Sequence, residues 1–287
     1  MVGSLNVDRS LSVEHFPKPG ETVLGHDLRI DNGGKGANQA VAAARLGAEV
    51  AMVGAVGDDV DGTQLRQALA LEGINVAGVS TSAESTGAAF ITIDNLGENS
   101  IVVASGANAT LSAESVAAAG SALDRADIVL AQLEIPLAAV AAAAEAAGGM
   151  FMLNPAPAPR SLDGLVRSID VLVPNRGELA AIVGRDIAGL DETAAAARTL
   201  EVPLIVVTLG PAGALVVADD YATHVPAVEV SVVDTTAAGD SFCGALAVAL
   251  AGGAAPVEAA QFASTCAAWT VGRRGAQAAL PRSEDVA

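Results

Sequence analysis

The segment at residues 234–246, DTTAAGDSFCGAL, has the residue types best suited to chemistry. A β-branched run ends at Asp234, small residues follow, and a helix-like stretch begins near Asp240. A strand, a turn of small residues and a helix start direct backbone N–H groups at an anion. Because Ala237, Ala238 and Gly239 lack bulk, a phosphate can approach that backbone, and the Asp240 carboxylate can accept a hydroxyl proton. The pattern predicts phosphoryl transfer to an alcohol, although aspartate at a helix start is also a common cap.

A second informative segment, DNGGKGANQA, spans residues 31–40. Three glycines within four positions, followed by Asn38 and Gln39 at a helix start, allow a polar ligand to approach the backbone closely. The segment is not a P-loop, because Lys35 is followed by Gly36, and it is not a dinucleotide fingerprint, because Gln39 replaces the third glycine. The alternative is a flexible turn with an asparagine near a helix cap.

Polar residues recur where predicted strands end. In a parallel sheet these ends meet at one edge, where such folds bind their ligands. Any one of these residues alone is better explained as a cap or turn residue. Their recurrence at several strand ends favours a site, and they are Asn6, Asp8, Glu134, Asn154, Asn175, Glu178, Thr208 and Gly210.

The elements that must position these side chains alternate between short apolar runs and alanine-rich helical stretches. Buried strands are predicted at residues 50–56, 127–131, 150–153, 170–173 and 204–209. Helices are predicted at residues 36–46, 63–71, 113–123, 136–147 and 191–200. The alternation predicts an α/β fold with a mainly parallel central sheet and helices on both faces.

Two regions, residues 9–32 and 86–104, break this alternation. The first has a strand-like stretch at 21–24, and the second resembles a hairpin of strands 88–93 and 100–104. We predict that they form one small separate sheet, a lid over the site, with extra edge strands of the main sheet as the alternative. Only Met1 and Val2 precede Gly3, so a first strand there must be short. No composition break divides residues 1–287, which are predicted to form a single catalytic domain.

The composition limits the classes of function. The net charge of −18 and the 2% aromatic content disfavour binding to nucleic acids or anionic membranes. The mean hydropathy of +0.47 reflects alanine, and no apolar run is long enough to span a bilayer. No export signal is evident, so a cytoplasmic location is expected. Cys243 and Cys266 are expected to be buried thiols, and the three histidines lack zinc-site spacing.

Taken in order, the short motifs of the chain resemble the ribokinase-type carbohydrate kinase family almost from end to end. The AAGD segment at 237–240 is shared across that family, whereas GGKGANQA (33–40), NPAPA (154–158) and RRGAQ (273–277) are more specific to its ribokinases. The other matching segments are GSLNVD (3–8), PGETV (19–23), GDD (57–59), STG (85–87), GENS (97–100), GANA (106–109), QLEIP (132–136), PNRGE (174–178) and VTLGPAG (207–213).

The resemblance implies ATP-dependent, magnesium-assisted phosphorylation of D-ribose at its 5-hydroxyl, activated by a monovalent cation such as potassium. It implies that Asp240 is the catalytic base and that Ala237, Ala238 and Gly239 form the anion hole. The matching sugar-binding positions are Asn6, Asp8, Gly34, Lys35, Gly36, Asn38, Glu134 and Asp240. The matching nucleotide positions are Asn175, Thr208, Leu209, Gly210, Pro211, Ala212, Gly213, Gly239 and Ser264. The matching metal positions are Asp234, Thr236, Thr270, Arg273 and Gly275 for the monovalent cation, with Glu178 linked to magnesium.

The resemblance also implies a homodimer that pairs through the lid sheet. Two positions depart from the family pattern: Ser264 replaces a frequent histidine near the adenine, and Ala279 replaces a serine of the cation loop. The alternatives are a kinase for deoxyribose, another pentose, fructose or a nucleoside, and a sugar sensor without catalysis. The few aromatic residues disfavour a nucleoside, and the intact Asp240 disfavours the sensor.

Overall fold

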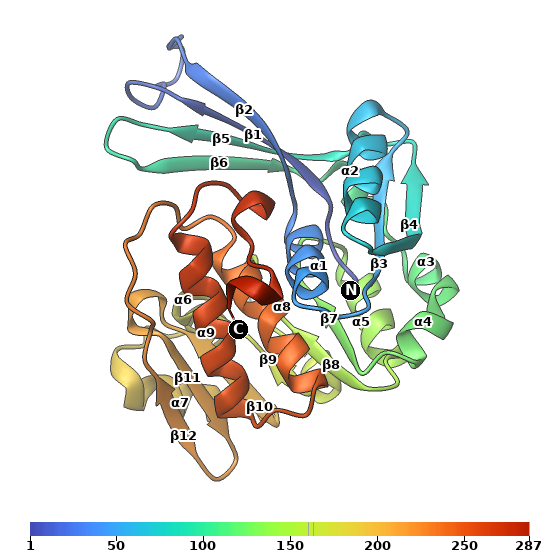
Figure 1. Ribbon diagram of the computed structural model, residues 1–287, viewed down its shortest axis with the longest axis vertical. Helices are drawn as coiled ribbons and strands as arrows, with labels where there is room; N and C mark the ends of the chain where they lie inside the picture. Colours follow the sequence, from blue (N-terminus) through green and yellow to red (C-terminus); the bar gives the residue numbers. More distant parts are fainter. Residues whose placement is uncertain (160, 163, 287) are drawn as a thin grey trace.

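The centre of the protein is a six-stranded sheet in a computed structural model that describes residues 1–159, 161–162 and 164–286 (Figure 1). Its strand order is β12-β11-β10-β9-β8-β7. Four strands run parallel: β7 (Ile128–Ala131), β8 (Met150–Leu153), β9 (Val171–Leu172) and β10 (Leu204–Thr208). Two antiparallel strands, β11 (Ala214–Ala218) and β12 (Ala222–Val225), extend the sheet at one side.

A second pair of parallel strands, β3 (Ala51–Gly57) and β4 (Asn75–Ser82), lies beyond β7. The N-terminal residues lie between the two sets of strands. Val2 forms parallel bridges to Val53 of β3 and to Ala131 of β7, and its N–H donates to the carbonyl of Leu130 at 2.9 Å. At the position of the expected short first strand, the described part of the chain therefore has only the two bridges of Val2.

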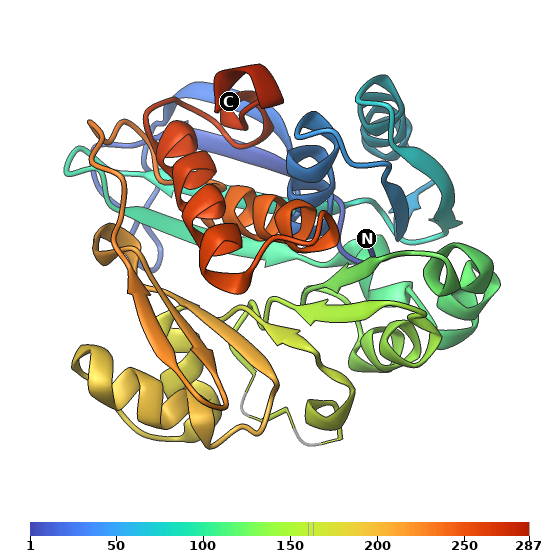
Figure 2. The ribbon, with the colours of Figure 1, turned by 60° about the horizontal axis from the view of Figure 1, so that its bottom comes forward.

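Helices cover both faces of the main sheet (Figure 2). One face packs against α8 (Ala238–Ala251) and α9 (Pro256–Val271). The other packs against α3 (Ala113–Ala118), α4 (Gly120–Asp124), α5 (Leu137–Ala146), α6 (Arg176–Val183) and α7 (Gly189–Arg198). The pairing of α1 (Lys35–Arg45) and α2 (Val60–Leu71) with β3 and β4 forms a third apolar cluster.

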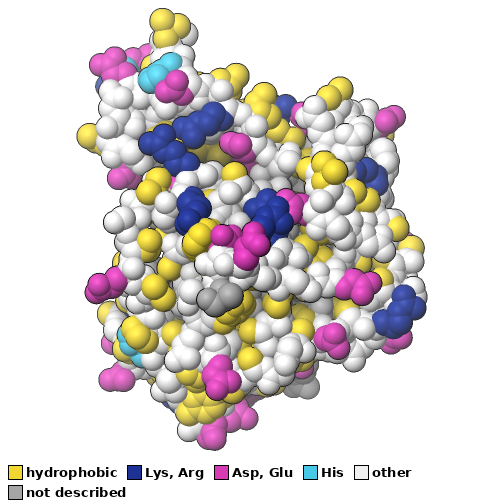
Figure 3. Space-filling model, in the orientation of Figure 1, with side chains coloured by type: hydrophobic (Ala, Val, Ile, Leu, Met, Phe, Trp, Pro, Cys, Tyr) yellow, Lys and Arg dark blue, Asp and Glu magenta, His cyan; other side chains and the backbone are white. Residues whose placement is uncertain are grey.

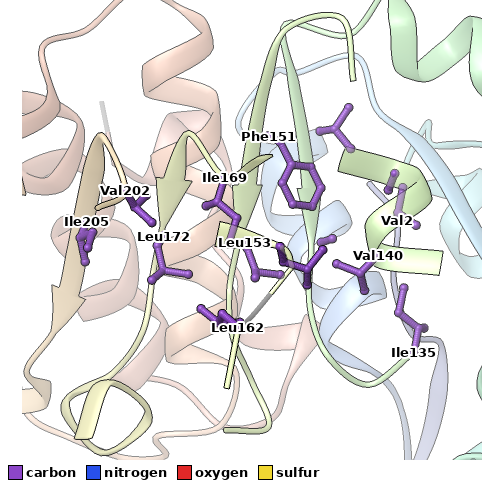
Figure 4. Close-up of a cluster of buried hydrophobic side chains, with 14 of the residues drawn as sticks. Val2, Ile135, Val140, Phe151, Leu153, Leu162, Ile169, Leu172, Val202 and Ile205 are labelled. Atoms are coloured by element: carbon purple, nitrogen blue, oxygen red, sulfur yellow. The ribbon is translucent and has the colours of Figure 1, made fainter. Parts of the chain in front are cut away.

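The alternation of side chains along β8 explains why both faces must be covered. Phe151 and Leu153 enter the core under α5, whereas Met152 between them faces α8 and α9. Figure 4 shows the first of these cores, with Leu153 and Val140 near one another and Phe151 above them. The predicted α/β class with helices on both faces is confirmed.

Residues of both irregular regions form a separate four-stranded sheet, in the order β2-β1-β5-β6. Its strands are β1 (Asn6–Ser12), β2 (His26–Gly33), β5 (Gly87–Ile93) and β6 (Asn99–Ala104). We call this the lid sheet; it projects beside the body at the end where α1 and α8 begin (Figure 1). Arg9 of β1 reaches Asp61 of α2 at 2.6 Å and ties the sheet to the body. The alternative, that these strands extend the main sheet, is wrong.

Three predicted elements differ from the structure. Residues 21–24 are not a strand, because Leu24 is 89% exposed and Glu21 closes a turn by accepting the N–H of Lys18. The helix predicted at 113–123 is two helices that meet at Ala119, just before Gly120. The β-branched run before Asp234 is not a strand either. Its valines are exposed and the N–H of Val233 donates instead to the carbonyl at the end of α9.

Asn6 and Asp8 also differ from expectation, because they lie within β1 rather than after a first strand. The strands β4, β11 and β12 are additional to those predicted. None of the helices that the described residues form combines the length and apolar character needed to cross a membrane.

Candidate active site

Asp240 lies in the first turn of α8 and is 8% exposed. Each of its carboxylate oxygens accepts a hydrogen bond from an amide of α1. Nδ2 of Asn38 donates to Oδ2 at 2.9 Å, and Nε2 of Gln39 donates to Oδ1 at 3.0 Å. The predicted base and a predicted sugar-binding residue are thus in direct contact.

The contact depends on the close approach of α1 and α8. A Cβ atom at Gly244 would lie 2.6 Å from the Cβ of Ala42 and 2.9 Å from the carbonyl oxygen of Gln39. Gly244 follows Asp240 by four residues, and Ala42 follows Asn38 by four, so each pair lies one turn apart on its helix. The absence of a side chain at Gly244 therefore allows the polar residues one turn earlier to meet.

The glycine-rich segment also lies against backbone. Gly34 has a φ of +89°, and a Cβ there would lie 2.7 Å from the backbone nitrogen of Asn6. A Cβ at Gly36 would lie 2.6 Å from the backbone nitrogen of Ser4. These positions require glycine because the start of α1 packs directly on the chain that enters β1. The sequence predicts that a polar ligand approaches this backbone. The glycines instead admit the protein's own backbone, and the approach of a ligand stays a prediction.

Asn6 and Asp8 lie at the base of the lid sheet. Asn6 is buried, and its Oδ1 accepts a hydrogen bond from Nδ2 of Asn108 at 2.7 Å. The carboxylate of Asp8 packs against Gly33, where a Cβ would lie 2.2 Å from Oδ2. Both side chains belong to the strand that joins the lid sheet to the body, so movement of the lid sheet also moves them.

Glu134, just after β7, joins the same region. Its Oε2 accepts the hydroxyl of Ser4 at 2.6 Å and the backbone N–H of Lys35 at 3.3 Å. The hydroxyl of Ser4 also accepts the N–H of Gly36 at 3.4 Å. These contacts hold the start of α1 against the end of β7.

The carboxyl groups of this region raise one another's proton affinity. Burial, followed by the charges of Glu134, Asp240 and Asp31, raises the pKa of Asp8 to about 7. Burial also raises the pKa of Asp240 above its usual value, although Lys35 and the donated amides of α1 oppose the shift. Burial by itself lowers the pKa of Lys35, but the nearby carboxylates outweigh it and raise that pKa. The ammonium group of Lys35 therefore interacts electrostatically with several carboxylates at once.

The predicted anion hole is the turn that begins α8. Ala237 has a φ of +59°, and its carbonyl accepts the N–H of Ser241 at 2.8 Å. The left-handed conformation of an alanine is uncommon and costs about 1 kcal/mol or more. The first N–H groups of a helix lack intrahelical partners, so Gly239 and Asp240 present donors at this end, whereas the N–H of Ala238 donates to the carbonyl of Thr235 at 3.3 Å. The geometry suits an anion, as the sequence predicts, but no strand precedes it.

Seven of the nine predicted nucleotide positions, all except Gly239 and Ser264, form a connected group. Asn175 caps α6, and its neighbour in the sheet is Thr208 at the end of β10. The turn Gly210–Ala212 follows, with its ends joined by the N–H of Leu209 and the carbonyl of Gly213 at 2.8 Å. Ser264 is buried in α9, where its hydroxyl donates to the carbonyl of Ala260, so it turns back into its own helix.

Glu178 forms a capping box with Asn175. Its Oε2 accepts the N–H of Asn175 at 2.7 Å, while its own N–H donates to Oδ1 of Asn175 at 2.8 Å. Burial raises the pKa of Glu178, with Lys35 opposing and Asp240 reinforcing the shift. The effect of Asp240 on this pKa indicates that Glu178 lies within electrostatic range of the predicted base.

Three predicted cation-site residues share a network centred on Asp234. Its Oδ1 accepts the amide and the hydroxyl of Thr236 at 2.9 and 2.6 Å, and its Oδ2 accepts the N–H of Gly275 at 3.0 Å. Burial alone raises the pKa of Asp234, but these hydrogen bonds outweigh it and hold the pKa below its usual value. The donor set offers oxygen atoms and an ionised carboxylate, which fits a hard monovalent cation.

The other two positions contribute differently. The hydroxyl of Thr270 is buried and lies 2.9 Å from the hydroxyl oxygen of Ser241 and 3.0 Å from the carbonyl oxygen of Cys266. Its carbonyl accepts the N–H of Arg273, whose guanidinium lies 3.3 Å from the ring centre of Trp269. Both side chains are therefore engaged away from Asp234, and the place of Thr270 and Arg273 in a cation site stays a prediction.

Several residues of this region are absent from the predicted site. Asn108 holds both the N–H and the carbonyl of Leu5, in addition to Asn6. Gln39, Gln132 and Asn154 form an amide chain that ends on Asp240. All four lie within motifs that carry the resemblance. Asn154 is also a candidate as a polar residue at a strand end, and Gln39 as part of the glycine-rich segment, whereas nothing else in the sequence singles out Asn108 and Gln132, because amides do not titrate.

Comparisons with known proteins show the family and the fold of the chain. A family model described as pfkB family carbohydrate kinase matches residues 1–283. The chain is 40% identical to the ribokinase of Haemophilus influenzae over 292 residues, covering 99% of this chain and 95% of that protein. It is 38% identical to the deoxyribokinase of Salmonella typhi over 292 residues, with coverages of 99% and 95%. The structure of Arabidopsis thaliana ribokinase complexed with ribose and ATP aligns at 32% identity with a TM-score of 0.90, covering 99% of this chain and 96% of that chain.

Proposed function

The chain belongs to the pfkB family of carbohydrate kinases and is a sugar kinase, and we propose that it transfers the γ-phosphoryl group of ATP to the 5-hydroxyl of D-ribose. The observation that carries the proposal is the buried carboxylate of Asp240 at the N-terminus of α8. It combines a proton acceptor and an anion-binding helix start in one turn, which is what phosphoryl transfer to an alcohol requires.

In the proposed reaction, the hydroxyl oxygen attacks the γ-phosphorus while its proton passes to Asp240. The new O–P bond forms as the bond to the β-phosphate oxygen breaks, and its electron pair leaves with ADP. The N–H groups of Gly239 and Asp240 at the start of α8 stabilise the charge of the transferred group. The raised pKa of Asp240 suits this step, because a carboxylate with greater proton affinity is a better base.

The sugar would bind between the lid sheet and the start of α1. Asn6, Asp8, Asn38 and Glu134 provide carboxylate and amide groups that pair with several hydroxyls. A site built to bind hydroxyls discriminates strongly against an analogue that lacks one of them, because its polar groups then stay unpaired. This supports a small polyhydroxylated acceptor rather than a nucleoside, which needs an apolar surface for its base.

Deoxyribose is the second candidate acceptor. The deoxyribokinase relative is nearly as similar in sequence as the ribokinase relative, at 38% against 40% identity over equal lengths. The two sugars differ by one hydroxyl, so discrimination between them depends on the hydrogen bonds made at a single position. The segments GGKGANQA and NPAPA support ribose.

The charges of the site support the use of a divalent cation. Lys35 is one ammonium group among Asp8, Glu134, Glu178 and Asp240, so the site cannot neutralise a nucleoside triphosphate unaided. Bound magnesium would neutralise phosphate charge as the transfer proceeds, and Glu178 is the residue we propose to hold it through its waters. A monovalent cation, potassium in our proposal, would bind the loop of Asp234, Thr236 and Gly275 and stiffen the anion hole without touching the acceptor.

Basic side chains lie on both sides of the junction between the lid sheet and the body (Figure 3), although the protein carries a net charge of −18. This distribution supports the approach of an anionic nucleotide on this face. We also propose that the lid sheet closes over the sugar and pairs with a second copy through its exposed residues Leu28, Ile30, Phe90, Ile101, Val102 and Val103. Light scattering of the protein alone and of a Val102→Asp variant tests the dimer.

The test of the function is an ADP-release assay with MgATP and potassium over a panel of sugars, run beside Asp240→Asn. Turnover highest on ribose and abolished in the variant is the expected result. Highest turnover on deoxyribose would move the assignment to that sugar and keep the mechanism. Full turnover by the variant would remove Asp240 from the reaction.

A further inference from the structure

Asp240 is the end of a chain of buried and half-buried amides that starts at a backbone carbonyl. Nδ2 of Asn154 donates to the carbonyl of Val173 at 2.8 Å, and Oδ1 of Asn154 accepts Nε2 of Gln39 at 3.2 Å. The same nitrogen of Gln39 donates to Oδ1 of Asp240, and its Oε1 accepts Nε2 of Gln132 at 2.5 Å. Gln39 thus contacts the carboxylate directly, and Asn154 and Gln132 each bond to Gln39 behind it. None of the three is assigned above to the sugar or the nucleotide.

The carbonyl of Val173 decides which way every amide in this chain points. A carbonyl oxygen only accepts hydrogen bonds, so Asn154 must turn its nitrogen toward Val173 and its oxygen toward Gln39. Gln39 must then present its nitrogen to Asn154, and therefore also to Asp240. Both hydrogens of that nitrogen are used, and the oxygen of Gln39 is left to face Gln132. The end of β9 thereby determines that the base receives a donor.

An unpaired oxygen atom of Gln132 supports this orientation of the amides. Oε1 of Gln132 is buried and has no hydrogen-bond partner among the described residues. It lies against Gly3, where a Cβ would come within 2.0 Å. A buried acceptor without a partner costs about 1–3 kcal/mol, and such groups usually have a functional explanation. Turning the amide of Gln132 over would bring its oxygen onto the oxygen of Gln39, so the unpaired atom is the cost of keeping Gln39 directed at Asp240.

We propose that Gln39, Gln132 and Asn154 are positioning residues that hold one oxygen of Asp240 and leave its remaining lone pairs directed at the acceptor hydroxyl. Amides suit this role because they donate to a carboxylate without taking up its proton. The other oxygen is held in a comparable way, since Asn38 donates to it and Oδ1 of Asn38 accepts Nε2 of Gln277 at 3.2 Å. The carboxylate is thereby fixed on both sides.

The inference rests on the proposed role of Asp240 as base, and it has a consequence for pH dependence. A donor to the ionised carboxylate favours the ionised form, so its removal raises the pH at which Asp240 loses its proton. The other groups that act on Asp240 through their charge or ionisation remain in place when Gln39 is changed. They are Asp8, Lys35, Glu134, Glu178 and Cys243.

The test is the pH profile of kcat for Gln39→Met, which keeps the length of the side chain and removes the donor. We expect the acid limb to move up by about 0.5–1 pH unit and kcat at pH 7 to fall about 10- to 100-fold. The KM values for sugar and ATP should change less than about threefold, because Gln39 is proposed to touch neither. Titration of the ¹³C-labelled carboxyl signal of Asp240, identified by its loss in Asp240→Asn, should show the same shift without turnover.

Gln132→Met is the second variant, because it disturbs only the direction of Gln39. A shift in the same sense and of smaller size is expected, and it keeps the inference testable if Gln39→Met does not fold. Val140→Ala, buried on the opposite face in α5, controls for loss of stability and should leave the profile unmoved.

The outcomes separate the inference from the function on which it rests. An unmoved acid limb in both glutamine variants, with Asp240→Asn inactive, would overturn the amide chain and leave the base in place. An active Asp240→Asn would overturn both. A fall in kcat that matches Val140→Ala at equal loss of stability would reduce the amides to ordinary core residues and also overturn the inference.

Discussion

Nδ2 of Asn38 donates to Oδ2 of Asp240 at 2.9 Å, and 202 positions of sequence separate the two residues. The contact joins the first turn of α1 to the first turn of α8. A glycine-rich turn precedes α1, and a turn of small residues precedes α8. Two helix starts with little side-chain bulk therefore meet at one carboxylate, which is how two distant motifs form a single site.

Replacement of Asp240 by alanine should lower kcat by about 10²–10⁴. The expected loss is that of a general base, because the helix start and the sugar-binding side chains remain. Sugar binding, measured by calorimetry without nucleotide, should stay within about threefold of the unchanged protein. Retention of full turnover would contradict the assigned role.

Asp8→Ala should weaken sugar binding more than nucleotide binding, because Asp8 lies at the base of the lid sheet beside Asn6. Binding of each ligand measured separately decides the point. Equal losses for both would mean that Asp8 does not face the sugar.

The stability of the protein should depend on the protonation of Asp8. Its pKa of about 7 in the folded protein exceeds the ordinary value of 3.8, so folding favours the protonated form. This contribution is fully present below about pH 4 and is lost as the pH rises through 7. Asp8→Asn removes the buried charge, so its unfolding free energy should exceed that of the unchanged protein by about 1–3 kcal/mol at pH 8 and by much less at pH 5. Urea unfolding at both pH values checks this, and a difference that does not grow with pH would contradict it.

Asp234→Asn should abolish most of the activation by potassium. The asparagine can accept on its oxygen only, so it loses either the bonds from Thr236 or the bond from Gly275, together with the charge that attracts the cation. The measurement is kcat against potassium concentration at constant ionic strength, with Asp220→Asn as the control because that exposed residue lies in the turn between β11 and β12. Unchanged potassium dependence in Asp234→Asn would move the cation elsewhere.

Gly244→Ala should cost both stability and turnover. The added methyl group meets Ala42 and the backbone of Gln39, so α1 and α8 must separate, and the hydrogen bonds to Asp240 one turn away must lengthen. A loss of about 1–3 kcal/mol is the usual cost of such overpacking. Gly120→Ala is the matched control, because a Cβ there meets no atom within 4 Å. It should leave both quantities nearly unchanged, and equal effects of the two substitutions would contradict the close approach.

The fold was largely predictable because buried parallel strands have a local signature. Runs such as residues 150–153 are apolar on both faces, and the alanine-rich helices between them are regular. The valines before Asp234 have the same composition but no neighbouring strand, and composition alone does not reveal a missing partner. Glu21 closes a turn through a local hydrogen bond that strand propensity does not register.

The candidate site was predictable to the extent that its residues have distinctive chemistry. Asp240 and the small residues before it are recognisable by type and spacing. Asn154 is recognisable as a polar residue at a strand end. The amide of Gln132 is not, because its importance comes from contacts with Gln39 whose direction is fixed by the carbonyl of Val173. Gly244 is hidden for the same reason, since only the distance between two helices explains it.

Val2 joins the six-stranded and two-stranded parts of the central sheet, with bridges to β3 and β7 on its two sides. Because Val2 alone among the described residues bridges the two parts, few hydrogen bonds must break for the two-stranded part to separate from the six-stranded part. The segment of β3, β4, α1 and α2 has its own apolar cluster and is connected to the lid sheet through β1 and β2. It is therefore suited to open and reclose as a cooperative unit without global unfolding. Hydrogen exchange of the Val2 and Val53 amides would report this opening, and the same motion would carry Asn38 and Gln39 away from Asp240.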